Sequence, residues 1–124
     1  MRLYNKDHTW VLAEGARARV GISDFAQAEL GDIAYVELPT AGARVSRGEV
    51  ACTVDSLKSS SEIYAPVSGT IVEANALLSS EENCALVNSD PLGTGWLFVI
   101  EMSEPGELDG LLPEAEYKKY VEGG

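Results

Sequence analysis

The chain has 124 residues with 9 Lys+Arg against 20 Asp+Glu, so its formal net charge is −11. A content of 45% hydrophobic and 23% charged residues is typical of a globular domain rather than a disordered acidic tail. The excess of acidic residues argues against binding to nucleic acid or to anionic membrane surfaces. No apolar run reaches the ~20 residues of a membrane span, and residues 1–7 lack the apolar core of a signal peptide. We therefore expect one cytoplasmic domain, residues 1–124, that binds neither nucleic acid nor membrane.

Short β-strands and one helix are predicted in the first third of the chain. Residues 10–13 and 17–22 form a predicted hairpin across the turn at 14–16. Ser23 can cap a short helix over 24–30, and Gly31 can end it. A β-branched and aromatic run follows at 33–38.

Further strands and a second helix are predicted in the rest of the chain. The strands are expected at 50–54, 63–65, 70–72 and 96–100, with turn signals between them. Val50, Cys52 and Val54 should share one face, and 96–100 is the most apolar run and should be central. Pro113 suits the first position of a C-terminal helix whose apolar face is Tyr117, Tyr120 and Val121. The pattern predicts a compact β-sandwich or barrel with two helices.

Few side chains of this sequence are suited to catalysis or metal binding. Cys52 and Cys84 lie on no metal-ligand spacing, and His8 is the only histidine. We read both cysteines as free thiols, with Cys52 in the core and Cys84 as a candidate exposed thiol. His8 is expected to be a structural hydrogen-bonding residue, and Trp10 and Trp96 are expected in the core. The composition thus favours a carrier or binding module over an enzyme.

One lysine stands apart in the sequence. Only four lysines occur, and Lys58 is the sole one between residues 7 and 117. It lies between two β runs in the segment Asp55-Ser56-Leu57-Lys58-Ser59, where Asp and Ser favour a tight turn through side-chain hydrogen bonds to the backbone. We expect Lys58 to project from the tip of a rigid hairpin, clear of the body. That arrangement suits an amine acylated by a cofactor better than one acting as a base.

A family resemblance rests on this hairpin and on motifs along the whole chain. Segment 55–69 reads DSLKSSSEIYAPVSG and resembles the lipoyl-lysine hairpin of glycine cleavage system H proteins. Agreement continues in DHTWV (7–11), VGISDFAQ (20–27), LGDI (30–33), VELP (36–39), LVNSDP (86–91), GW (95–96) and the segment 108–117. Biotin carriers usually flank their lysine with Met, and 2-oxoacid dehydrogenase lipoyl domains usually read Asp-Lys-Ala; neither pattern fits.

The resemblance implies a fold, a cofactor and a set of partners. The fold would be mainly β, a barrel-sandwich hybrid of the lipoyl-domain type with a short helix near 24–30 and a C-terminal helix. Lipoate would be attached covalently to Lys58 by a lipoate-attaching enzyme. The carrier would move the aminomethyl group of glycine from the P protein (glycine decarboxylase) to the T protein (aminomethyltransferase), and the L protein (dihydrolipoyl dehydrogenase) would reoxidise it. We expect a monomer that is not itself an enzyme and has no catalytic residue and no metal.

The resemblance also implies a sheltered site for the loaded, cationic arm. Glu62 matches the acidic residue that follows the lysine in the family. A Glu is expected where this chain has Thr9, and a Thr hydroxyl accepts a hydrogen bond but offers no countercharge. Asp7 is adjacent and could substitute, and His8 is a further candidate contact. A second departure is the longer segment 79–84, read as a surface-loop insertion.

Two other functions stay open at this point. One is a lipoyl carrier of the same fold in another pathway, such as sulfur-compound oxidation or lipoate relay, and Thr9 is its chief support. The other is an unmodified acidic β-domain that acts only as an interaction module. Residues 101–124 carry 7 acidic and 2 basic side chains, read as a solvated face or as a docking surface for basic partners.

Overall fold

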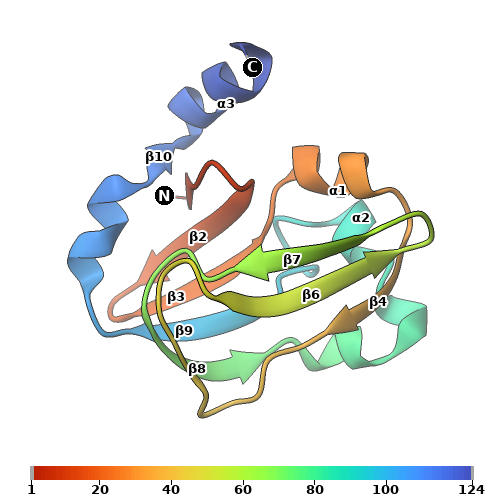
Figure 1. Ribbon diagram of the computed structural model, residues 1–124, viewed down its shortest axis with the longest axis horizontal. Helices are drawn as coiled ribbons and strands as arrows, with labels where there is room; N and C mark the ends of the chain where they lie inside the picture. The colour runs from red at the N-terminus through yellow and green to blue at the C-terminus, as the bar shows by residue number, and fades with distance from the viewer. Residues whose placement is uncertain (1, 124) are drawn as a thin grey trace.

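Two antiparallel sheets face each other across one core (Figure 1) in the computed structural model, which describes residues 2–123. The larger sheet has the strand order β10-β1-β2-β3-β9-β8-β5, and the smaller has the order β4-β6-β7. The strands are β1 (Arg2–Tyr4), β2 (Thr9–Glu14), β3 (Arg17–Ile22), β4 (Ile33–Glu37), β5 (Arg44–Val45), β6 (Val50–Ser56), β7 (Ser60–Tyr64), β8 (Gly69–Ala74), β9 (Phe98–Met102) and β10 (Leu112–Pro113). The expected mainly β, barrel-sandwich architecture is confirmed.

Short helices connect and flank the sheets. They are α1 (Asp24–Leu30), α2 (Leu86–Ser89), α3 (Glu114–Gly123) and the 3-10 segments η1 (Ala76–Ser79), η2 (Glu81–Asn83) and η3 (Pro105–Gly110). The Ser23 hydroxyl caps α1 by accepting a hydrogen bond from the Ala26 N–H at 3.1 Å. Gly31 ends α1 with φ 81° and donates its N–H to the Gln27 carbonyl. The bounds and both ends of this helix are as the sequence predicts.

The larger sheet is built around the β2–β3 hairpin and β9. β2 and β3 pair across the predicted turn, and β9 lies between β3 and β8 as expected of the most apolar run. Trp10 is fully buried, as predicted. Trp96 lies just before β9 and is only partly buried, and it packs against the cluster that contains Trp10, so the prediction that it is core holds in part. The Arg19 guanidinium covers the Trp96 ring at 5.0 Å, which explains how an exposed edge is tolerated.

β6 departs from the predicted alternation at its first residue. Cys52 and Val54 are buried, but Val50 is 46% exposed. The register against β7 shifts between Val50 and Cys52, because two steps along β6 match one step along β7. This β-bulge turns Val50 away from the face that Cys52 and Val54 share.

The C-terminal helix begins one residue later than predicted. Pro113 lies in the edge strand β10, opposite Leu3, and α3 starts at Glu114. A proline is tolerated in an edge strand because its missing N–H is not needed for pairing on the open side. Tyr117 is buried and stacks on Tyr4 with ring centroids 4.3 Å apart, whereas Tyr120 is 39% exposed. The predicted apolar face therefore packs mainly through Tyr117, against the N-terminal strand.

Both cysteines are buried free thiols. Cys84 follows η2 and is fully buried, so the interpretation of it as an exposed thiol is wrong: its Sγ lies 3.5 Å from the Leu78 carbonyl oxygen. Burial raises the pKa of Cys52 to about 12 and raises that of Cys84 as well. Thiolates, the reactive form, are therefore disfavoured at both positions.

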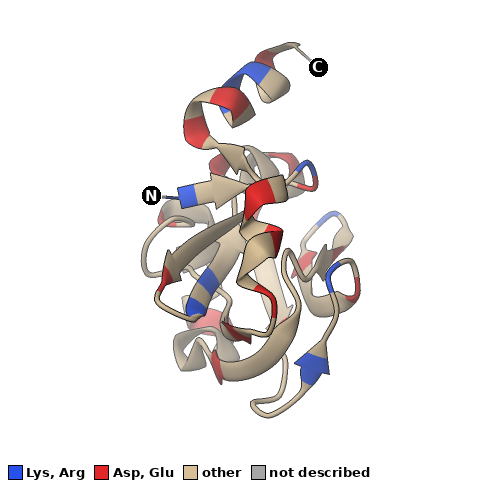
Figure 2. Cartoon of the chain, turned by 90° about the vertical axis from the view of Figure 1, so that its left-hand side faces the viewer, with Lys and Arg blue, Asp and Glu red and all other residues tan. Residues whose placement is uncertain are grey.

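Acidic side chains are distributed over the surface rather than gathered in the sheets. Figure 2 shows Asp and Glu on the side that carries η3 and α3, and α3 carries Lys beside its acidic residues. Within residues 2–123, no helix has the length and apolar character needed to cross a membrane.

Gly21→Ala should destabilise the fold by about 1–3 kcal/mol, because the new β-carbon would lie 2.6 Å from Cζ2 of the buried Trp10 ring. That ring cannot move freely, since its Nε1–H donates to the Pro91 carbonyl at 3.0 Å. Urea unfolding monitored by Trp fluorescence measures the change. Gly106→Ala is the matched control, because its β-carbon would meet no atom within 4 Å. Equal unfolding midpoints for the two variants would contradict the packing argument.

Candidate functional site

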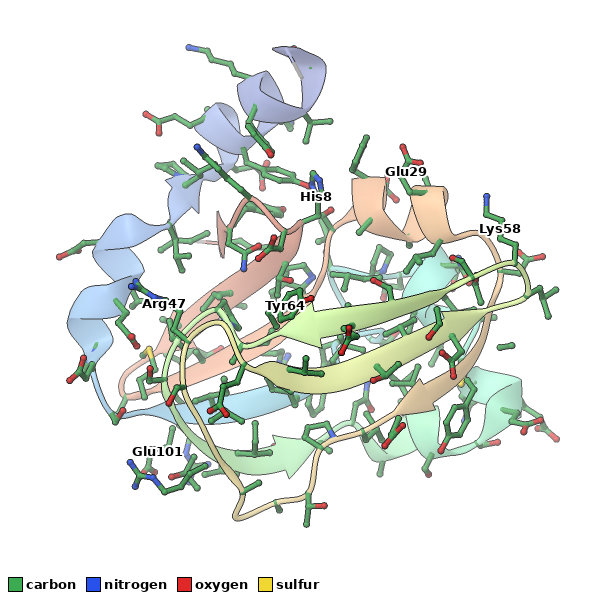
Figure 3. The ribbon with its side chains drawn as sticks, viewed as in Figure 1. His8, Glu29, Arg47, Lys58, Tyr64 and Glu101 are labelled. Carbon is green, nitrogen blue, oxygen red and sulfur yellow. The ribbon has the colours of Figure 1, made fainter. Side chains whose placement is uncertain are left out.

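The hairpin formed by β6 and β7 carries Lys58 at its tip, as the sequence predicts (Figure 3). Ser56 shapes the turn: its hydroxyl accepts from the N–H groups of Lys58 at 3.3 Å and Ser59 at 3.0 Å, and its own N–H donates to the Ser59 carbonyl at 2.8 Å. Lys58 is exposed. A short, hydrogen-bonded turn thus presents one accessible amine on a stiff support.

The hairpin tip rests on the end of α1 instead of standing clear of the body. The Leu57 N–H donates to the Asp32 carbonyl at 3.0 Å, just beyond that helix. The methylene stem of Lys58 passes over Gly31, where an added β-carbon would lie 3.2 Å from Cε. The expectation that Lys58 projects away from the body is therefore wrong. The absence of a side chain at residue 31 lets the stem lie against the helix end.

A cleft of about 320 Å³ lies between α1, β7 and the turn that joins β1 to β2. Asp7, His8, Thr9 and Glu62, the four candidate contacts, all line it. Sequence reasoning missed other members of the lining, among them Lys6, Phe25, Glu29 and Tyr64. An acidic residue in the last turn of the predicted helix was the available signal for Glu29, because acids are disfavoured at that end.

His8 connects the cleft to α1 and α3. It has a φ of 67°, an uncommon left-handed backbone, and its ring lies 4.6 Å from the Phe25 ring. Its Nδ1 is 2.7 Å from the Tyr117 hydroxyl, which in turn is 2.8 Å from the Ser23 hydroxyl. Burial lowers the pKa of His8, against smaller opposing effects of Asp7 and Glu29. A neutral, hydrogen-bonded His8 fits the structural role expected for it.

The charge of the cleft comes from its rim. Thr9 is 1% exposed, and its N–H donates to the Asn5 side chain, so residue 9 is a fixed part of the wall. Three carboxylates, those of Asp7, Glu29 and Glu62, face one ammonium, that of Lys6, among the lining residues. The cleft therefore combines an apolar floor with an acidic rim, which suits a chain-like ligand with a cationic end.

A second cavity of about 450 Å³ lies between α3 and the start of α1, and Tyr4, Phe25 and Tyr117 line part of it. Although it is larger, none of the four candidate contacts lines it. We associate the candidate chemistry with the smaller cleft, because it is lined by all four candidate contacts and by residues of β7, which belongs to the hairpin bearing Lys58.

Two sheets around one core, with a single lysine at the tip of a hairpin in the smaller sheet, define a barrel-sandwich hybrid of the lipoyl-domain type. Residues 2–124 match the family model described as Glycine cleavage H-protein. The chain therefore belongs to the glycine cleavage H-protein family.

Individual relatives agree with this assignment over nearly their full length. Glycine cleavage system H proteins of Thermus thermophilus and Thermotoga maritima are 48% and 47% identical to the chain; the matches cover 98% and 97% of this chain and 93% and 95% of those proteins. A crystal structure of a glycine cleavage system H protein from Mycobacterium marinum is similar with a TM-score of 0.84 and 37% identity, covering 97% of this chain and 95% of that one.

His8 should make the folded state more sensitive to mild acid. Because its pKa is lower in the folded state, the unfolded chain binds a proton first as the pH falls below about 6.5. The stability of the wild type should therefore decline over the range below about pH 6.5 more steeply than that of His8→Asn, since Asn tolerates the left-handed backbone. Thermal unfolding of both proteins across this range measures the difference. Parallel curves would contradict it.

Proposed function

We propose that residues 1–124 form one lipoyl carrier domain of the glycine cleavage system, with lipoate joined through an amide to the Nζ of Lys58. The observation that carries the proposal is the exposed Lys58 amine on a rigid turn, adjoining a cleft, in a chain of this family. Acylation needs an accessible amine, and the turn supplies it. The apolar floor and acidic rim of the cleft suit the hydrocarbon arm and the cationic group it carries.

In this proposal the cofactor supplies the reactive group and the protein holds and presents it. When bound, lipoate supplies a dithiolane that exchanges between disulfide and dithiol forms and can carry a one-carbon amine. The chain itself holds the arm, presents it and excludes water from it, and is not an enzyme. We propose Asp7, His8, Thr9 and Glu62 as its contacts to the arm, because all four line the cleft.

The partners follow from the carrier role. We propose that the chain, as a cytoplasmic monomer, receives the aminomethyl group of glycine at the P protein, delivers it to the T protein and is reoxidised by the L protein. A lipoate-attaching enzyme must first recognise the hairpin, whose tip also exposes the apolar Leu57. Tethering raises the effective concentration of the arm at each partner and prevents loss of the intermediate by diffusion.

Lys58→Arg should abolish lipoylation, because a guanidinium cannot take the place of the acylated amine. The chain is incubated with lipoate, ATP and a lipoate ligase, and its intact mass is measured. We expect the wild type to gain the mass of one lipoyl group and Lys58→Arg to gain none. Lys118→Arg, an exposed lysine on α3, is the control and should be modified like the wild type. A wild type that gains no mass would instead favour the unmodified interaction module.

A carrier of the same fold in another lipoate-dependent pathway, such as sulfur-compound oxidation or lipoate relay, is the second candidate function. Thr9 favours it, because this residue places no charge in the cleft wall.

The lipoylated chain should support exchange of labelled CO2 with the carboxyl group of glycine in the presence of P protein, because the first candidate requires loading by that enzyme. The exchange rate is measured as carrier concentration rises. Lipoylated Lys118→Arg should match the wild type, and unmodified Lys58→Arg should give no exchange above P protein alone. Absence of exchange with saturating lipoylated wild type would favour the second candidate.

A further inference from the structure

Thr9 contributes a polar side chain to the cleft wall, but no negative charge that could balance a bound cation. The residue is 1% exposed and lines the cleft, and its backbone N–H donates to the Asn5 side chain. The hydroxyl of a threonine that lines a cleft can bond to a ligand or to water. It can accept a hydrogen bond from an ammonium, but a carboxylate must come from elsewhere to balance the charge.

Glu29 has the position needed to supply that charge. It lies in the last turn of α1, two residues before Gly31 and therefore roughly 3 Å along the helix axis from the point where the Lys58 stem passes. In Figure 3 its side chain lies between His8 and Lys58 along the same edge of the molecule. Its carboxylate also acts on the titration of His8, so its field reaches the wall beside Thr9.

The placement of Glu29 is unfavourable for the helix itself. A carboxylate in the last turn faces the negative end of the backbone dipoles, and α1 has no basic residue in that turn. Glu29 forms no salt bridge within residues 2–123. Glu29 is exposed where it lines the cleft, so its carboxylate is open to a cation carried by a ligand.

The other ionisable groups of the cleft are less suited to the same task. Asp7 is next to Lys6, whose ammonium lies 5.6 Å from the Tyr120 ring centroid and would repel a second cation. Glu62 lies on β7, on the opposite side of the cleft from α1. Acylation of Lys58 removes its positive charge, so the end of α1 loses a neighbouring cation when the arm is attached.

We propose that Glu29 is the positioning residue that holds the ammonium carried by the lipoyl arm, taking the role of the carboxylate missing at residue 9. The Thr9 hydroxyl accepts a hydrogen bond from the same ammonium, and Glu62 closes the other side. This inference rests on the proposed function and adds the residue that selects a cationic arm. Glu29 acts by electrostatic attraction and exclusion of water and takes no part in bond making.

A stable cationic arm tests the inference without any partner enzyme. The lipoylated chain is reduced with a phosphine and alkylated with 2-bromoethylamine, so that each arm sulfur gains an aminoethyl group as bromide leaves. Alkylation with 2-bromoethanol gives a neutral arm of the same shape. The buried Cys52 and Cys84 should be spared in the native chain, and peptide mapping verifies this.

Thermal unfolding then compares the cationic and the neutral arm. In the wild type the cationic arm should raise the midpoint about 1–5 °C above the neutral one, and added salt should shrink the difference. Glu29→Gln should remove most of this difference. Glu101→Gln is the matched control, because Glu101 is an exposed glutamate far from Lys58 at the other end of the molecule in Figure 3.

A kinetic measurement gives a second, independent readout. With the arm loaded by aminomethyl transfer and all partner enzymes absent, water breaks the carbon–sulfur bond and releases formaldehyde and ammonium while the thiol is regenerated. Glu29→Gln should release formaldehyde about three- to tenfold faster than the wild type. Adding Thr9→Glu to Glu29→Gln should restore slow release, because a carboxylate then returns to the cleft wall.

The outcomes separate this inference from the proposed function. A wild-type midpoint difference and slow release that persist in Glu29→Gln overturn the role of Glu29 and leave the carrier function standing. The same holds if only Asp7→Asn or only Glu62→Gln produces the loss. Failure of Lys58 to accept lipoate overturns both the proposed function and the inference.

Discussion

The contact between the β6–β7 hairpin tip and the end of α1 is the constraint on which the site depends. Gly31 combines a left-handed φ of 81° with the absence of a β-carbon beneath the Lys58 stem. The Leu57 N–H bond to the Asp32 carbonyl fixes the same junction. Because these contacts join two elements far apart in the sequence, the Lys58 stem has a defined position at the end of α1, the helix that lines one side of the cleft.

A second junction fixes the opposite wall of the cleft. The hydroxyls of Ser23 and Tyr117 and the Nδ1 of His8 form a continuous hydrogen-bonded set that joins α1, α3 and the β1–β2 turn. Ser23 thereby caps α1 and anchors α3 with one side chain. Tyr117 is further held by stacking on Tyr4, so the C-terminal helix supports the wall without lining the cleft. Tyr117 is therefore the buried residue through which the otherwise exposed, acidic helix α3 packs on the rest of the domain.

Local sequence signals predicted α1, the β2–β3 hairpin and the Lys58 turn, because each depends on a cap, a turn residue or alternation within a few positions. Tertiary effects were missed. The bulge that exposes Val50 needs the partner register of β7, and burial of Cys84 needs the packing around Leu78. Asp7, His8, Thr9 and Glu62 were proposed through a resemblance. The acid in the last turn of α1 was a weak sequence signal for Glu29, and its place in the cleft becomes visible when α1 is seen beside the hairpin.

The net charge of −11 does not show how charge is distributed around the site. The end of α1 is negative through its backbone carbonyls and through Glu29, and the unmodified Lys58 stem crosses this end. Attachment of an acyl group neutralises that lysine, so Lys6 is then the one ammonium beside the three carboxylates among the described residues that line the cleft. A rim left in this state discriminates between arms by charge: it attracts an arm that ends in an ammonium and offers nothing to a neutral one. The same carboxylate that weakens the helix end thus makes retention of the arm depend on what the arm carries.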